Sequence, residues 1–163
     1  MKIWQRVLIV SLIGVLGLAA YGYYRYTAPE IPSSAYQHFR DLDEIELCSV
    51  HPFDGKEAVD YGNGNIDGYM IVDIGTTAPK KLIAELLAAD KANNTMAAKC
   101  FWPHHAIRDP NNHDNYFLIC FKCMQVRYSH NGEKGLALIS KSAKNLFESK
   151  VDELGLERSK ETK

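Results

Sequence analysis

One stretch of the sequence, from Cys100 to Cys123, constrains this chain more than any other. It reads CFWPHHAIRDPNNHDNYFLICFKC and holds three of the four cysteines and three of the six histidines. Thiols and imidazoles act as metal ligands, and thiols also act as disulfide partners or nucleophiles. The chemistry of this chain therefore depends on whether the fold brings these side chains together at one site.

The spacing within this stretch first suggests a zinc site. Four residues have the spacing C-x4-H-x14-C-x2-C, namely Cys100, His105, Cys120 and Cys123. A Cys-x-x-Cys pair with two soft ligands upstream is a form that four-coordinate zinc sites take. Residues three apart in a regular strand point to opposite faces, so both sulfurs can bind one ion only if Phe121 and Lys122 form a turn or bulge.

Other states of the same cysteines remain open. In an oxidising compartment cysteines pair with each other more often than they bind metal. A disulfide from Cys100 to Cys120 or to Cys123, with the remaining thiols buried, is therefore slightly favoured over zinc, and buried free thiols are the third interpretation. A redox-active Cys-x-x-Cys is disfavoured, because such pairs usually lie at a helix amino terminus and this one lies in a strand-like run.

The neighbouring polar residues have simpler interpretations. His104 and His105 are adjacent, so at most one of them is expected to point at the cysteines. His113 lies in a polar turn, where we expect it to be solvated. Arg108 and Asp109 are most simply a local ion pair.

The amino-terminal segment predicts a membrane anchor. Residues 7–20 carry no charge and follow Lys2 and Arg6, which fits either a cleaved signal peptide or an anchor. Extended to Tyr24, the apolar run approaches the length of about 17–25 residues that a spanning helix needs, and its tyrosines fit an interfacial aromatic belt. We interpret residues 1–26 as an uncleaved anchor, with residues 7–24 in the membrane.

Charge predicts the orientation and limits the partners. Lys2 and Arg6 precede the apolar run and only Arg25 follows it closely, so the amino terminus is expected in the cytoplasm. This predicts a single-pass inner-membrane protein with a periplasmic carboxy-terminal domain. Without those three cations, the 19 Lys and Arg residues fall to 16 against 20 Asp and Glu residues. This acidic balance disfavours a nucleic-acid partner.

Residue patterning behind the anchor predicts one domain. We interpret residues 27–42 as a spacer, 43–156 as an α+β domain and 157–163 as a charged tail. Strands are expected at 45–50, 68–75, 116–128 with a break at the Cys-x-x-Cys, and 135–140. Asn131-Gly132 predicts a hairpin, and helices are expected at 77–90 and 142–154.

The predicted fold class is therefore α+β. It has an N-terminal single transmembrane helix, followed by a small antiparallel sheet of four or five strands with two helices packed on one face.

Two motifs carry a resemblance to a known family. They are Cys100-Phe101-x-Pro103-His104-His105-Ala106-Ile107 and Ile119-Cys120-Phe121-x-Cys123. They resemble a family of small uncharacterised bacterial proteins, many of them exported or membrane-anchored, over roughly residues 45–156. The family more often has Arg where this chain has His104. The resemblance implies that His105 acts with the cysteines, and it implies no activity.

These observations favour a binding function over catalysis. The sequence has no Gly-rich phosphate loop, no Gly-x-Ser-x-Gly and no His-Glu-x-x-His motif. We expect a membrane-anchored extracytoplasmic binding module with a protein partner, in which the Cys/His cluster is a structural staple, held by a disulfide or by zinc. The alternatives are a thiol-based enzyme, either an oxidoreductase or a hydrolase with His105 as base, and an immunity-type inhibitor of an exported toxin.

Overall fold

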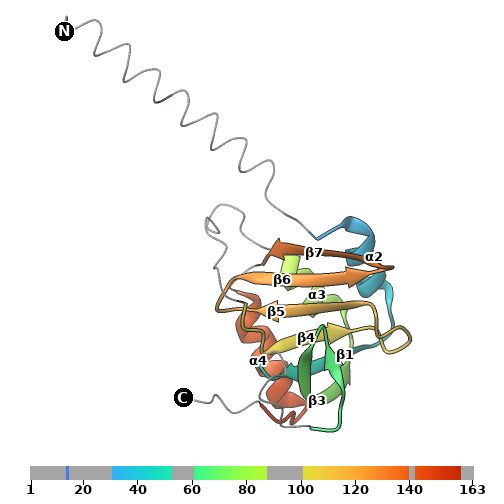
Figure 1. Ribbon diagram of the computed structural model, residues 1–163, viewed down its shortest axis with the longest axis vertical. Helices are drawn as coiled ribbons and strands as arrows, with labels where there is room; N and C mark the ends of the chain where they lie inside the picture. The colour runs from blue at the N-terminus through green and yellow to red at the C-terminus, as the bar shows by residue number, and fades with distance from the viewer. Residues whose placement is uncertain (1–13, 15–30, 53–60, 88–100, 140–141, 159–163) are drawn as a thin grey trace, which may run out of the picture.

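A computed structural model describes residues 14, 31–52, 61–87, 101–139 and 142–158 of the chain. Within these ranges lie three helices and one sheet of seven strands (Figure 1). The helices are α2 (Ser33–Asp41), α3 (Lys80–Leu87) and α4 (Ala143–Glu153). The strands are β1 (Ile45–Val50), β2 (Asn65–Ile66), β3 (Tyr69–Thr77), β4 (His105–Arg108), β5 (Tyr116–Cys120), β6 (Gln125–His130) and β7 (Glu133–Leu138).

The strands form one antiparallel sheet that curves into a half-barrel. Their order is β2-β3-β1-β4-β5-β6-β7, and each neighbouring pair is antiparallel. Figure 1 shows the strands stacked from β7 at the top to β3 at the bottom, with α3 behind them. Four of the connections are hairpins between sequence neighbours, because β2 and β3, and also β4, β5, β6 and β7, follow one another both in the chain and in the sheet.

One face of the sheet, the helix face, packs against the three helices. A register row crosses six strands on this face, comprising Gly75, Leu47, Ile107, Phe117, Tyr128 and Gly135. Phe39 of α2 and Phe147 of α4 are fully buried against this apolar row. Strand residues alternate between the two faces, so each strand contributes every second side chain to this core.

The β2–β3 hairpin covers part of the other face, which we name the hairpin face. Cys48, Ala106 and Leu118 are register partners on this face, and Tyr69 joins their buried cluster. The hairpin turns at Asp67 and Gly68, with φ angles of 52° and 87°, values that glycine and aspartate tolerate better than most residues. The half-barrel therefore curls toward the hairpin face.

The fold class predicted from the sequence is wrong. The described residues form seven strands and three helices instead of four or five strands and two helices, and none of those helices has the length and apolarity to cross a membrane. Strand β2 has two residues and β4 has four, which are too few to show an alternating pattern. The transmembrane helix was predicted within residues 1–26, which lie outside the described residues except for Gly14. The membrane contact through residues 7–24 and the localisation stay predictions.

Helix α2 lies inside the segment interpreted as a spacer, 27–42. Its Ala35 and Phe39 are fully buried in the helix-face core, so residues 33–41 belong to the folded domain. Their spacing of four residues places both side chains on one side of the helix. The sequence indicates one or two helical turns at residues 36–42, but so short a pattern does not show that the segment packs in the core.

Several local predictions are confirmed. Strands β5 and β6 are separate, with the break at the Cys-x-x-Cys, and Asn131 and Gly132 connect β6 to β7 with φ angles of 52° and 82°. Helix α4 buries Phe147 and Val151, and Gly155, at a φ of 66°, follows its end.

Replacing Gly135 by alanine should destabilise the fold. A Cβ atom at this position would meet the ring of Tyr128, its register partner on β6. Because the ring is packed in the core, we expect a loss of about 1–3 kcal/mol in the free energy of unfolding. Urea denaturation measures it. The neighbouring change Glu133→Ala, at an exposed side chain, should stay within about 0.5 kcal/mol, and equal effects of the two changes would contradict this packing.

Candidate functional site

The Cys-x-x-Cys motif forms the turn between β5 and β6. Strand β5 ends at Cys120, and the turn closes with Met124 at a φ of 56°. Cys120 and Cys123 form a disulfide, with their Cα atoms 5.2 Å apart. The backbone N–H of Cys123 also donates to the Cys120 Sγ, at 3.0 Å. Both cysteines are buried, so the disulfide is enclosed by the hairpin turn.

The described residues do not assemble the four predicted zinc ligands. Cys120 and Cys123 are bonded to each other, instead of either being bonded to Cys100. Cys100 lies outside the described residues. Among the residues that the structure describes, no group of three or more His, Cys, Asp or Glu side chains is arranged to hold a metal ion. A zinc site at Cys100, His105, Cys120 and Cys123 therefore stays a prediction that requires the disulfide to be reduced.

His105 is buried among aromatic rings on the helix face. Its ring centroid lies 5.5 Å from that of Phe121 and 6.0 Å from that of Phe147, both in edge contacts. Its Nδ1 is buried without a hydrogen-bond partner. Burial lowers the pKa of His105 to about 3, so the ring is neutral near pH 7 and a weak base.

Other polar side chains in or near this stretch pair with residues that are distant in the sequence, or are buried. The predicted local ion pair of Arg108 with Asp109 is wrong, because Arg108 Nε donates to Glu46 Oε2 at 2.6 Å across the β1–β4 pair. His113 is 59% exposed, and its Nε2 lies 3.8 Å from the same Glu46 carboxylate. Cys48 carries a free buried thiol, and burial raises its pKa to about 12.

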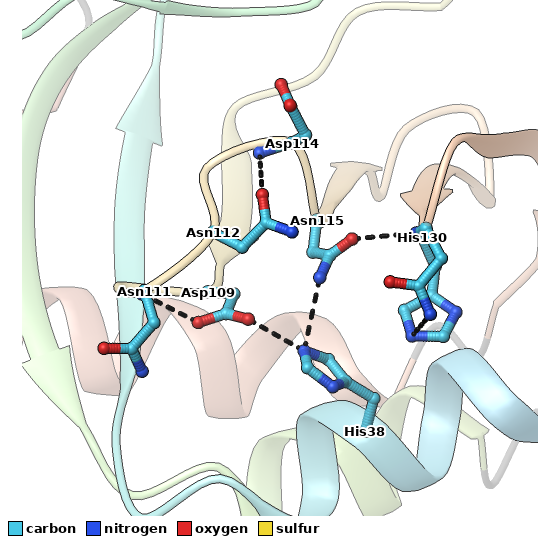
Figure 2. A network of polar contacts seen from close by, with 8 residues as sticks. His38, Asp109, Asn111, Asn112, Asp114, Asn115 and His130 are labelled. Carbon is cyan, nitrogen blue, oxygen red and sulfur yellow. Dashed lines mark hydrogen bonds and ion pairs between the residues drawn. The ribbon is translucent and has the colours of Figure 1, made fainter.

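The structure brings together a polar network that the sequence did not reveal, centred on His38 and Asp109 (Figure 2). His38, on α2, hydrogen-bonds through Nε2 to Asp109 Oδ2 at 2.8 Å. The N–H of Asn111 donates to the other carboxylate oxygen at 2.8 Å. Burial raises the pKa of Asp109, but the hydrogen bonds from Asn111, His38 and Asn115, together with the charge interaction with His38, outweigh it and hold the pKa below its usual value. The carboxyl group is therefore ionised at neutral pH.

The network continues to the β6–β7 turn through Asn115. Asn115 Oδ1 accepts the backbone N–H of Asn131 at 2.9 Å, and Asn115 Nδ2 lies 3.5 Å from His38 Nε2. The ring of His130 lies against that of His38, with centroids 5.0 Å apart, and burial lowers the pKa of His130. These contacts fasten α2 to two adjacent turns of the sheet. The DPNNHDN turn was predicted, but its partner His38 lies 71 residues away from Asp109, and no local pattern reports such a pair.

A second group of side chains forms what we name the cation–aromatic band. It consists of Lys122, Trp102, Phe101, Arg127, Asp67, Lys134 and Tyr116. Arg127 lies over the Phe101 ring at 4.2 Å, while Lys122 lies 6.0 Å from the Trp102 ring and Lys134 lies 6.0 Å from the Tyr116 ring. Each distance joins the cationic atom to the ring centroid, within the range of a cation–π contact.

Asp67 links two of the three cations of this band. Its carboxylate lies 3.2 Å from Lys134 Nζ and 4.0 Å from Arg127 Nη1. The tip of the β2–β3 hairpin therefore reaches across the hairpin face to β6 and β7. The cations and rings of the band come from different strands and turns, so no local pattern in the sequence joins them.

Comparisons with protein-family models, with curated proteins and with solved structures found no match. The resemblance stated from the two motifs stays a prediction.

The pH dependence of stability tests the burial of His105. Its folded-state pKa is depressed, so the unfolded chain takes up the proton first, and stability is lost as pH falls from about 6.5 toward about 3. We expect His105→Phe to remove a slope of about 1 kcal/mol per pH unit from this range. Urea denaturation between pH 7 and pH 4.5 measures the difference from the unmodified protein. His113→Asn, at an exposed ring, serves as control, and unchanged slopes in both variants would contradict the burial.

Replacing Asp109 by asparagine tests the network. We expect Asp109→Asn to lower the free energy of unfolding at pH 7 by about 1–3 kcal/mol, because His38 loses a charged acceptor. The folded pKa of Asp109 is depressed, so its stabilisation is present above the unfolded pKa and is lost as pH falls through the folded pKa. Asp114→Asn makes the same charge change at an exposed site of that turn and should stay within about 0.5 kcal/mol. Denaturation at pH 7 and pH 3 measures both, and equal losses for the two variants at pH 7 would show that the network does not fasten α2.

Proposed function

We propose that this protein is an extracytoplasmic binding module. Its fold is fastened by the Cys120–Cys123 disulfide, and it meets a protein partner through the cation–aromatic band. The band is the observation that carries the proposal. It gathers three cations and three aromatic rings, and each cation lies over one of the rings.

The disulfide supports a location outside the cytoplasm. Disulfides persist in oxidising compartments and are rare where thiols are kept reduced. Cys120 is fully buried and Cys123 is 1% exposed, which favours a structural bond over one that exchanges with a substrate. A disulfide that closes so short a loop lowers the conformational entropy of the unfolded chain, which stabilises the fold by about 2 kcal/mol.

The side chains of the band support recognition of a protein. Trp102 is 40% exposed, and among the described residues it is the one large hydrophobic residue that is exposed to solvent. Tryptophan, tyrosine and arginine are the residue types that dominate the binding energy of protein interfaces. The Trp102 ring contacts Lys122, and the Arg127 guanidinium group lies over Phe101. Because these contacts already restrict both side chains, binding a partner costs little further side-chain entropy.

The thiol-based enzyme is less well supported. The sulfurs of Cys48, Cys120 and Cys123 belong to buried residues, and the depressed pKa of His105 makes it a weak base. A nucleophilic thiol needs access to its substrate and a lowered pKa, whereas burial raises the pKa of Cys48 to about 12. An immunity-type inhibitor would be one form of binding module, and it stays a prediction.

Site-specific cross-linking in the native cell tests the binding function. Trp102 is replaced by photoreactive benzoylphenylalanine in the full-length protein, and Lys81, exposed on α3, is replaced in the same way as the matched control. We expect a protein adduct of defined mass from position 102 and none from position 81. The absence of an adduct at position 102, or the same adduct at both positions, would contradict a partner at the band.

The change Trp102→Ala supplies the second arm of this test. Because more than half of the side chain is shielded from solvent, its removal should lower the free energy of unfolding by about 1–2 kcal/mol, and circular dichroism confirms that the variant is folded. The same variant should lose the adduct when the photoreactive group is placed at Lys122 instead. Retention of that adduct would show that Trp102 is not part of the contact.

A further inference from the structure

The members of the cation–aromatic band come from the β5–β6 turn, the segment before β4, the tip of the β2–β3 hairpin, and strands β5, β6 and β7. Lys122 stands in the β5–β6 turn over Trp102, and the adjacent Phe101 lies under Arg127 of β6. Asp67 then connects Arg127 to Lys134 of β7. Figure 1 shows β6 and β7 side by side at the top of the sheet. The members of the band therefore range from the disulfide turn to the edge strand β7.

The charges of this surface are opposite to those of the domain. Without residues 1–26, the chain has 16 Lys and Arg residues against 20 Asp and Glu residues. The band has three cations, Lys122, Arg127 and Lys134, and a single carboxylate, Asp67. One carboxylate shared by two cations leaves an excess of positive charge within a negative domain.

The cations keep donors for further acceptors. Arg127 has a guanidinium group with five N–H donors, its side chain is 39% exposed, and its ion pair with Asp67 is as long as 4.0 Å. Lys134 has three donors and is 64% exposed, with one carboxylate at 3.2 Å. Glu46, the nearest carboxylate along the Tyr116 register row, is engaged by Arg108 at 2.6 Å. The exposed cations can therefore donate hydrogen bonds to carboxylates of another molecule.

We infer that the partner of this module presents an acidic segment, and that the band binds this segment through its carboxylates. This inference rests on the proposed binding function. Carboxylates of the segment pair with Arg127 and Lys134, and an apolar or aromatic side chain of the segment packs on Trp102. Charge-assisted pairs with arginine are directional, which gives the surface specificity for carboxylates.

A short acidic segment fits the charge distribution better than an extended polyanion. Nucleic acids and anionic membranes carry regular negative charge over distances that exceed the band. Beyond the band such a partner would meet the net negative charge of the domain, which repels it. A short acidic protein segment carries negative charge only where it contacts the band, so the rest of the domain does not repel it.

A labelled peptide tests the inference directly. The probe is a short synthetic peptide of alternating glutamate and tyrosine, titrated with the full-length protein while its fluorescence anisotropy is followed. We expect saturable binding that weakens as salt is raised, because surface ion pairs are screened. The same titration with single-stranded oligothymidylate and with anionic phospholipid vesicles provides the competing outcomes.

Charge-reversal variants locate the binding. Arg127→Glu with Lys134→Glu should weaken peptide binding at least about tenfold, or about 1.4 kcal/mol. Lys80→Glu with Lys81→Glu changes the net charge equally on α3, at exposed side chains, and should change binding less than about twofold. Lys122→Glu lies at the other end of the band from Asp67, so it tests the surface without disturbing the hairpin contact. Circular dichroism confirms that each variant is folded.

Three results would overturn the inference. They are the absence of peptide binding, equal weakening by the α3 variant, and tighter binding of oligothymidylate or vesicles than of the peptide. If one of these results is found but position 102 still gives a specific cross-link, the binding function is retained and the partner does not present an acidic segment. Failure of the cross-link as well would remove both.

Discussion

The disulfide between Cys120 and Cys123 closes the turn on which the register of β6 depends. In a sheet, a slip of one residue moves every following side chain to the opposite face. With the turn closed after Cys120, Val126 packs on the helix face and Arg127 stands on the hairpin face over Phe101. The same turn directs Phe121 into contact with His105. One short covalent link thus sets both the core contact and the surface contact of this hairpin.

The two faces of the sheet have different roles. The helix face is apolar across six strands, and even its buried imidazole, His105, is surrounded by aromatic rings. The hairpin face mixes a small apolar cluster with paired charges, from the Glu46–Arg108 pair to the cations around Asp67. Among the described residues, the helices cover one face and the β2–β3 hairpin covers part of the other, so we look for the side chains available to a partner on the hairpin face. The His38–Asp109 network keeps α2 on the helix face.

Local signals in the sequence predicted local structure well. Alternation predicted β1, the Asn-Gly pair predicted the β6–β7 turn, and the Cys-x-x-Cys predicted a break between β5 and β6. Elements of two to four residues were missed, because a period needs several repeats to be visible. Partners far apart in the sequence were also missed: Arg108 pairs with Glu46 rather than Asp109, and the band joins residues of the β2–β3 hairpin to β6 and β7. The zinc hypothesis relied on spacing alone, and spacing does not report whether two sulfurs are bonded to each other.

Peptide mapping without reduction tests the disulfide most directly. Trypsin cleaves after Lys and Arg, so the three cysteines of the stretch fall on separate peptides, 100–108, 109–122 and 123–127. Protein purified from its native cell is alkylated, denatured and digested, and the linked peptides are identified by mass spectrometry. We predict that 109–122 is joined to 123–127. A link from 100–108 to either of the other peptides, or alkylation of all three, would contradict it.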